Sequence, residues 1–196
     1  VIFMNYGVYG NYRKIRNASW KCLIDCNITS LPVSLDEIIT KSDIHVKYEK
    51  SPNILEYDEK GASILTQEGK WFIVINSTLS YEERRFTVAH EIGHIFLGHM
   101  LTPIDDIAFL TSGRKPAEES SADMFALRLL SPACVLWALD IEKANDISAL
   151  CRIPDNYAQI RETRMKELIK RNKFLSSPVE RRLFENFRNF IELYHI

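Results

Sequence analysis

His90-Glu91-Ile92-Gly93-His94 is an H-E-x-x-H motif, and it lies within a strongly apolar stretch that predicts a helix. Two histidines four residues apart lie about 40° apart around an α-helix and roughly 6 Å apart along it, so both imidazoles can reach one metal ion. Glu91 follows the first histidine and is placed to act as a general base toward an attacking water. The motif therefore predicts a zinc-dependent peptidase, with His90 and His94 as metal ligands and Glu91 as the catalytic acid/base.

The surroundings of the motif argue against an ordinary amphipathic helix that carries two histidines on its surface. The neighbouring apolar residues are Phe86, Val88, Ala89, Ile92, Ile95, Phe96 and Leu97. Charged and imidazole groups among such neighbours are more often coordinated or paired than idle. Gly93 costs about 1 kcal/mol relative to Ala inside a helix, which suggests that another segment packs closely against it.

A second motif supplies a third ligand. Residues 116–127 predict a further helix, on which Glu119 and Asp123 are four residues apart and share one face. One carboxylate of such a pair can bind a metal while the other accepts the N–H of a metal-bound histidine. We assign Glu119 as the ligand and Asp123 as the partner of a histidine, because only from position 119 does the four-residue step reach an Asp. Glu118 is the competing ligand.

Two histidines and one carboxylate with an open fourth position are the arrangement of catalytic zinc sites. We expect one Zn²⁺ per chain, with Mn²⁺ as the less favoured metal. The class with three histidine ligands, H-E-x-x-H-x-x-G-x-x-H, is excluded, because Leu97 and Met100 occupy the positions of its Gly and last His. His99 is out of register by one residue. We expect it at the helix C-terminus, where it complements the dipole and flanks the site, rather than on the metal.

The composition indicates one globular domain with no general attraction to nucleic acid or to an anionic membrane. The chain has 196 residues, of which 46% are hydrophobic, and a net charge of −1. Residues 1–140 carry 14 basic and 18 acidic side chains, whereas residues 141–196 carry 11 and 8. The longest apolar runs, such as 71–75, are too short to cross a bilayer, and the N-terminus shows no signal-peptide pattern. We therefore expect an unsecreted protein that does not span a membrane.

The four cysteines predict reduced thiols. Cys22 and Cys26 are four residues apart on an expected helix, Cys134 and Cys151 lie far along the sequence, and no C-x-x-C spacing occurs. In an unsecreted chain such residues belong in or near the core. A second metal site that uses Cys22 and Cys26 is the weaker alternative, because no matching pair completes it.

The remaining pattern predicts an α+β protein, with a small antiparallel or mixed sheet packed on the H-E-x-x-H helix. Alternating residues predict a strand at 44–48, and Glu68-Gly69 marks the turn of a hairpin between 62–66 and 71–76. Ser80 and Glu83 form a capping box at the start of the motif helix. Helices are expected over 6–28, 35–42, 81–99, 116–130, 132–140, 146–151, 154–170 and 178–193.

This order of elements has consequences for the site. An edge strand of the sheet would lie beside the metal, where an extended peptide can add to it. Residues 100–115 are expected to connect the two motif helices, and they could also close over the cleft. We assign residues 1–140 to the zinc metallopeptidase domain, including its N-terminal helix, and residues 141–196 to a helical C-terminal region.

The two motifs resemble those of the ImmA/IrrE family of metallopeptidases. The resemblance lies in Arg85 to His99 (RFTVAHEIGHIFLGH) and in Glu119 to Ala126 (ESSADMFA) with the following Leu130-Ser131-Pro132, at the separation expected for that family. Together with the preceding helix, strand and hairpin it covers roughly residues 10–170. It implies a thermolysin-like (gluzincin) zincin mini-fold. It also implies that His90, His94 and Glu119 are the metal ligands, Glu91 the catalytic acid/base and Asp123 the partner of a ligand histidine.

The resemblance further implies a regulatory function. Members of the family typically cleave a helix-turn-helix repressor in the cytoplasm and so derepress genes of a mobile element, a prophage or a stress response. A C-terminal sensor domain, which some relatives carry, is not expected here, because about 55 residues after Asp140 are too few for one. A thermolysin-like site also uses a His or Tyr to stabilise the oxyanion, and Tyr81, His99 and Tyr157 are the residues considered for it.

Two other functions compete with proteolysis. Residues 146–171 look like a degraded helix-turn-helix, and residues 161–182 hold eight basic side chains against three acidic ones. This region could contact DNA or dock against a repressor, although a solvated helical cap is the commoner explanation of a basic helical face. The second alternative is a metal-binding scaffold without general proteolytic activity. An intact Glu91 argues against it, because a structural zinc site needs no base and is usually closed by four protein ligands.

Overall fold

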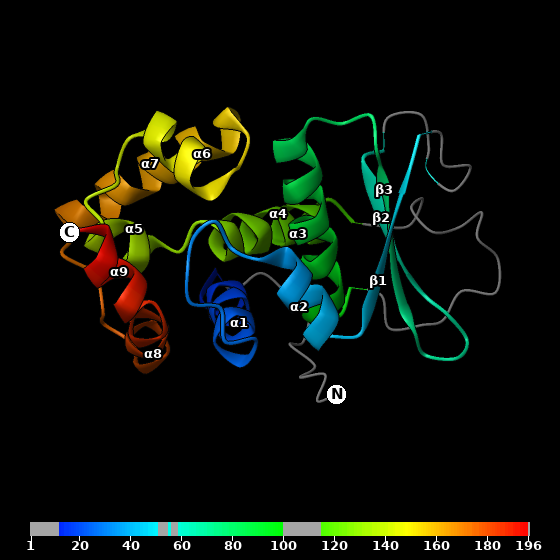
Figure 1. Cartoon of the computed structure of the whole chain (residues 1–196), viewed down its shortest axis with the longest axis horizontal. Coiled ribbons are helices and arrows are strands. Elements are labelled where there is room, and N and C mark those ends of the chain that lie inside the picture. The colour runs from blue at the N-terminus through cyan, green and yellow to red at the C-terminus, as the bar shows by residue number, and fades with distance from the viewer. Residues whose placement is uncertain (1–11, 51–54, 56–58, 100–114, 196) are drawn as a thin grey trace.

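The computed structural model describes residues 12–50, 55, 59–99 and 115–195, which form a three-stranded sheet and a larger set of helices (Figure 1). The strands are β1 (Ile44–Glu49), β2 (Gly61–Leu65) and β3 (Trp71–Asn76). The helices are α1 (Tyr12–Asp25), α2 (Leu35–Lys41), α3 (Tyr81–Leu97), α4 (Pro116–Leu130), α5 (Ala133–Ala138), α6 (Ala144–Cys151), α7 (Asp155–Lys170), α8 (Pro178–Asn186) and α9 (Arg188–Tyr194). The predicted α+β class is confirmed.

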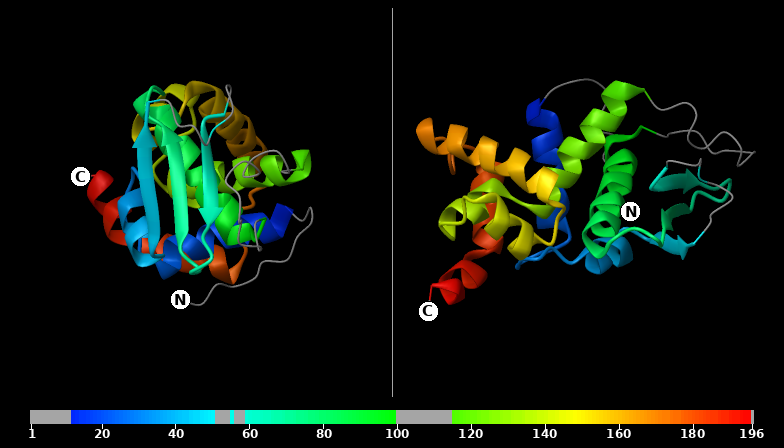
Figure 2. Two further views of the ribbon diagram at one scale, coloured as in Figure 1. Left: turned by 90° about the vertical axis from the view of Figure 1, so that its right-hand side faces the viewer. Right: turned by 90° about the horizontal axis from the view of Figure 1, so that it is seen from above.

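The sheet is mixed, with the order β1-β3-β2. The predicted hairpin is present as the antiparallel pair β2 and β3, and β1 joins the other side of β3 in parallel. β3 is the most apolar strand. Both of its faces are covered at Ile73, Val74 and Ile75, and a strand buried on both faces needs apolar residues at successive positions. Figure 2 (left) shows the sheet face on, with the helices behind it.

Helix α3 packs against the inner face of the sheet and has well-defined ends. The Ser80 hydroxyl accepts the backbone N–H of Glu83, and the Glu83 carboxylate accepts the backbone N–H of Ser80, so the predicted capping box is present. Gly98 adopts the left-handed conformation, with φ 73°, and ends the helix two residues earlier than the sequence predicted. The chain reverses there, which turns His99 back toward the helix.

Helix α4 crosses α3 at a contact that requires glycine (Figure 1). A Cβ atom on Gly93 would lie 3.1 Å from Phe125 Cδ1 and 3.3 Å from both Cα and the carbonyl oxygen of Ala122. The close packing suggested by Gly93 in the sequence is therefore present. It brings the N-terminal half of α4 against the half of α3 that carries the H-E-x-x-H histidines.

Gly61 plays the same part on the other side of α3. A Cβ atom at this position would lie 2.7 Å from Thr87 Cγ2 and 2.9 Å from Ile75 Cδ1. Because Gly61 has no side chain, the start of β2 can approach α3 closely. Among the described residues β2 is an edge of the sheet, so this contact sets an edge strand beside the motif helix, as predicted.

The C-terminal helices lie farthest from the sheet and are joined to α4 by a buried arginine (Figure 1). Arg161 of α7 is 3% exposed and donates from Nη2 to the Leu127 carbonyl and from Nε to the Ser131 hydroxyl, both over 2.9 Å. Burial lowers the pKa of Arg161 to about 10, which leaves the guanidinium charged at neutral pH. The Leu127 carbonyl, which also accepts the backbone N–H of Ser131, lies in the last turn of α4, where cations are favoured.

Other predicted boundaries differ from the structure. α1 ends at Asp25 rather than 28, because Asn27 adopts a left-handed φ of 50°. The helix predicted over 178–193 is two helices, α8 and α9, separated at Phe187. The start predicted at residue 6 and the loop 100–114, with its suggested closing role, lie outside the described residues.

One apolar segment is long enough to cross a membrane, but the fold accounts for it. Pro116–Ala138 satisfies the length and composition of such a span, and 78% of its most apolar window is buried inside the protein. The segment comprises α4 and α5, which are separated at Ser131-Pro132. Its apolar character is that of a core helix, and it gives little support to a membrane span.

Candidate metal centre

The four side chains of the two motifs meet where α3 crosses α4. α3 supplies His90 and His94 from successive turns, and α4 supplies Glu119 and Asp123 from successive turns. Among the described residues, His90, His94 and Glu119 form the one group of three whose ligand atoms lie close enough to hold a single metal ion. Sequence spacing had grouped the same residues.

The donor atoms form a triangle of the size that zinc requires. His90 Nε2 lies 2.9 Å from His94 Nε2 and 3.1 Å from Glu119 Oε2, and His94 Nε2 lies 3.3 Å from Glu119 Oε1. Ligands at ordinary zinc distances in a tetrahedral site are separated by about 3.3 Å. The observed triangle is slightly smaller than one face of that tetrahedron. The Glu119 side chain is 41% exposed, so the triangle is not fully enclosed by protein.

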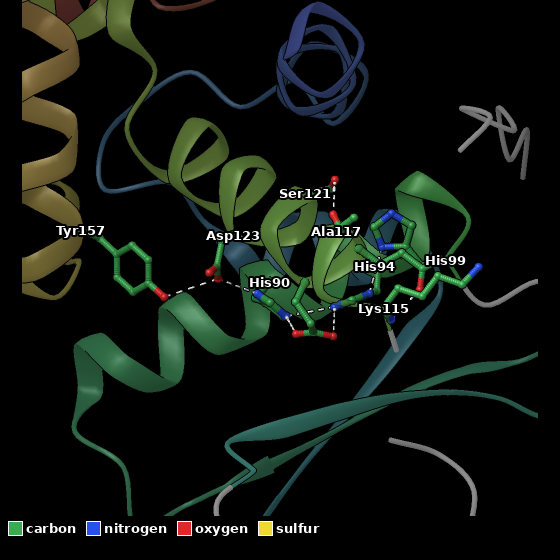
Figure 3. Close-up of polar contacts among 10 residues, drawn as sticks. His90, His94, His99, Lys115, Ala117, Ser121, Asp123 and Tyr157 are labelled. Carbon is green, nitrogen blue, oxygen red and sulfur yellow. Dashed lines mark hydrogen bonds and ion pairs between the residues drawn. The ribbon is translucent and has the colours of Figure 1, made fainter. Parts of the chain in front are cut away.

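The second carboxylate of α4 holds the first histidine by its other nitrogen. Asp123 Oδ1 lies 2.8 Å from His90 Nδ1, which directs Nε2 into the triangle (Figure 3). Burial disfavours the imidazolium, yet the hydrogen bonds to Asp123 and Glu119 raise the pKa of His90 to about 9. Burial also favours a neutral Glu119, but its contacts with His90 and His94 hold the pKa of that carboxyl well below its usual range. The site therefore favours a positive charge at its centre.

The second histidine is fully buried and has a different neighbour. His94 has no exposed surface, and its Nδ1 lies 3.0 Å from Nδ1 of His99. The sequence placed His99 beside the site, and the structure places it there through His94. It does not belong to the group of potential metal ligands.

A cavity of about 370 Å³ opens beside the triangle. Its lining comes from the start of β2, from α3, from α4 and from α7: Glu59, Lys60, Gly61, Glu83, Phe86, Thr87, His90, Glu91, Glu119, Asp123, Pro154 and Tyr157. Glu91 lines this cavity while only 1% of its surface is exposed. A carboxylate in that position faces whatever occupies the cavity next to the triangle.

The structure separates the residues that the sequence left as alternatives. Glu118 accepts the backbone N–H of Lys115 at the start of α4 and does not belong to the triangle. Tyr81 is 52% exposed and lines a different cavity, with Arg84 and Arg85. Tyr157 lines the site cavity, and its hydroxyl donates to Asp123 Oδ1 over 3.4 Å (Figure 3).

Some lining residues were not predicted from the sequence. Phe86 stacks on Tyr157, with ring centroids 3.5 Å apart, and Lys60 contributes to the rim through its ion pair with Glu83. The one available signal was Gly61, since a glycine within a strand pattern often marks the close approach of another segment. Cys22 and Cys26 are both buried, and no described group of metal ligands includes them.

More than half of the chain is similar to a known protein family. Residues 39–157 match the model of Peptidase_M78, which is described as an IrrE N-terminal-like domain. The matched region is more than half of the chain and contains both motifs. It ends at Tyr157, the residue of α7 that lines the cavity. No curated protein matches the chain.

Proposed function

This chain belongs to the Peptidase_M78 family of IrrE N-terminal-like domains, a family of metallopeptidase type, and we propose that it is a zinc-dependent endopeptidase. The observation that carries the proposal is the geometry of the site. Two imidazoles and a carboxylate form a triangle of zinc size, and a buried glutamate lines the adjoining cavity. Three protein ligands beside an open cavity suit a catalytic site better than a structural one, which is usually closed by a fourth ligand.

Each side chain then has a role. His90, His94 and Glu119 would hold the ion, and Asp123 would orient His90. A bound zinc ion supplies a Lewis acid that polarises the scissile carbonyl and makes water a better nucleophile at neutral pH. Glu91 takes a proton from the attacking water and delivers it to the leaving amine.

Tyr157 is the best placed of the residues considered for the oxyanion. It lines the cavity, whereas Tyr81 faces another cavity and His99 contacts His94. Burial raises the pKa of Tyr157 to about 12, so its hydroxyl is a hydrogen-bond donor at any working pH. We assign it the hydrogen bond that stabilises the developing negative charge, for which its single O–H turns from Asp123 Oδ1 toward the substrate.

The substrate that we propose is a protein, bound in extended form along β2. In the part of the chain that the structure describes, this strand is a sheet edge, and its first residue lines the cavity beside His90 and Glu91. A peptide that pairs with this edge would run past the metal triangle. The resemblance of the motifs to ImmA/IrrE proteins supports a cytoplasmic helix-turn-helix repressor as that protein, with derepression of mobile-element, prophage or stress genes as the result.

Direct DNA binding by the basic C-terminal helices is the less favoured use of this region. Arg161 is buried against α4, while Arg164 pairs with Glu167 and Lys166 pairs with Glu162. These cations are engaged within the protein, which leaves fewer for a phosphate backbone. Salt-sensitive binding of duplex DNA that persists in Glu91→Gln would favour the DNA alternative.

Metal content is the first test. Elemental analysis of the wild type should find one zinc per chain, lost in Glu119→Ala and retained in Glu118→Ala and Glu91→Gln. Folded wild-type protein that takes up no metal when zinc is supplied would contradict the proposal. Cleavage is the second test: zinc-loaded wild type added to a bacterial lysate should create new protein N-termini, in repressors above all, that are absent with Glu91→Gln.

A further inference from the structure

We propose that His99 is a positioning residue, which orients His94 for the metal as Asp123 orients His90; the inference rests on the proposed function of the same site. The observation is the contact between the two rings. Their Nδ1 atoms are 3.0 Å apart, and the ring centroids are 4.9 Å apart at an interplanar angle of 71°. That edge arrangement directs one ring nitrogen at the other, as a hydrogen bond requires.

The direction of this hydrogen bond follows from the other side of His94. Its Nε2 lies 2.9 Å from His90 Nε2 and 3.3 Å from Glu119 Oε1, so this nitrogen belongs to the metal triangle. A ligating nitrogen must offer its lone pair, and a neutral imidazole carries one proton. The proton of His94 therefore lies on Nδ1, where it is donated to Nδ1 of His99. His99 acts as the acceptor and carries its own proton on Nε2.

The chain builds this contact with the turn that ends α3. The backbone N–H of His99 donates to the carbonyl of His94 over 3.0 Å, and the N–H of Gly98 donates to Ile95 over 3.2 Å. With Gly98 in the left-handed conformation, these two bonds form a Schellman motif. The motif commonly brings the side chains of the same two positions together, usually as an apolar contact. Here both positions are histidines, so backbone and side chain join the same pair (Figure 3).

A neutral partner suits the charge of the site. Zn²⁺ with two neutral histidines and the carboxylates of Glu119 and Asp123 is already neutral, before the nearby buried carboxylate of Glu91 is counted. A carboxylate in place of His99 would add an uncompensated negative charge beside His94, which is fully buried. An imidazole accepts the same hydrogen bond without that charge. The two ligand histidines are thus fixed by partners of different chemistry.

The test separates the acceptor atom from the rest of the side chain. In His99→Asn the amide oxygen can occupy nearly the position of Nδ1, whereas in His99→Gln the oxygen reaches the position of Nε2. We expect the Kd for zinc to stay within about threefold of the wild type in His99→Asn. It should rise by about 10- to 100-fold in His99→Gln and His99→Leu, as for other partners of metal-bound histidines. The Kd is measured by competition with a chelator of known affinity.

Two further readouts guard against a purely structural effect. The visible absorption spectrum of the Co²⁺-loaded protein reports ligand geometry, and it should change in His99→Gln but not in His99→Asn. Thermal unfolding of the metal-free variants should stay close to that of the wild type. His195→Gln is the matched control, because its ring contacts the carbonyl of Ala138 at the other end of the molecule.

Zinc affinities that are equal in wild type, His99→Gln and His99→Leu would overturn the inference while leaving the metal site intact. Equal losses in His99→Asn and His99→Gln would also overturn it, because the acceptor position would then not matter. A wild-type protein that binds no zinc would fail the proposed function itself, which is a distinguishable outcome.

Discussion

Asp123 Oδ1 lies 2.8 Å from Nδ1 of His90, and the same carboxylate oxygen receives the hydroxyl of Tyr157 over 3.4 Å. A single oxygen on α4 thereby joins a residue of α3 to a residue of α7. Because His90 Nε2 belongs to the metal triangle, this oxygen determines the direction of a ligand without touching the ion.

Asp123 should therefore contribute to zinc affinity through its hydrogen-bond acceptor and, separately, through its negative charge. Asp123→Ala removes both the acceptor and the charge, so zinc should bind about 10- to 100-fold more weakly. Asp123→Asn keeps an acceptor oxygen and should fall between Ala and the wild type. Chelator competition at one pH gives the three affinities. Zinc binding by Asp123→Ala that equals the wild type would show that His90 needs no such partner.

Gly93→Ala should destabilise the protein even though alanine favours a helix. Helix propensity alone would add about 1 kcal/mol of stability. The added methyl group would meet Phe125 and Ala122 at 3.1–3.3 Å, and overpacking of this kind costs about 1–3 kcal/mol. Urea unfolding measures the sum. Ser120→Ala, at an exposed position of α4, is the control, and a Gly93→Ala protein more stable than the wild type would refute the packing argument.

Tyr157 should ionise only in strongly alkaline solution. Burial favours the neutral phenol, and the charge of Asp123 and its hydrogen bond act in the same direction, so the pKa is raised to about 12. Phenolate absorbance near 295 nm should show no contribution from this residue below about pH 11. The difference between wild type and Tyr157→Phe in the metal-free folded protein isolates it. A difference that titrates at the ordinary tyrosine pKa would mean that the hydroxyl is solvated.

The four thiols should differ in reactivity. Burial raises the pKa of Cys151 to about 12 and that of Cys134 further, so at pH 8 neither supplies thiolate. The hydrogen bond from Cys22 lowers the pKa of Cys26 and leaves Cys22 with a raised pKa. A disulfide reagent at pH 8 should modify Cys26 first, and Cys26→Ser should remove that fast phase. Cys134 and Cys151 should react only in denaturant; fast reaction of either in the native protein would contradict their burial.

The metal triangle could be predicted from the sequence because its information is local. His90 with His94, and Glu119 with Asp123, are pairs four residues apart, and helical geometry alone puts each pair on one face. Only the packing of one pair against the other depends on tertiary structure, and Gly93 indicated that another segment packs closely on the motif helix. The hairpin and the capping box of α3 were equally local and are present.

The contacts that could not be predicted join distant segments or depend on a turn. Tyr157 is 34 residues from Asp123, and no periodicity links a residue of α7 to one of α4. The parallel pairing of β1 with β3 depends on which side of the hairpin the strand takes. His99 was expected to complement the helix dipole and to flank the site; it does flank the site, but its contact with His94 depends on the left-handed Gly98. The break at Phe187 has no glycine or proline to mark it.

Helices α4 and α7 are joined by two contacts that are four residues apart on each helix. Tyr157 contacts Asp123, and four residues on, Arg161 contacts Leu127, which is four residues beyond Asp123. A slide of α7 by one residue would break both contacts at once. These two contacts therefore fix the register of α7 relative to α4, the helix that carries Glu119 and Asp123. A partner that displaced α7 along α4 would therefore also disturb the carboxylate of Asp123, which orients His90.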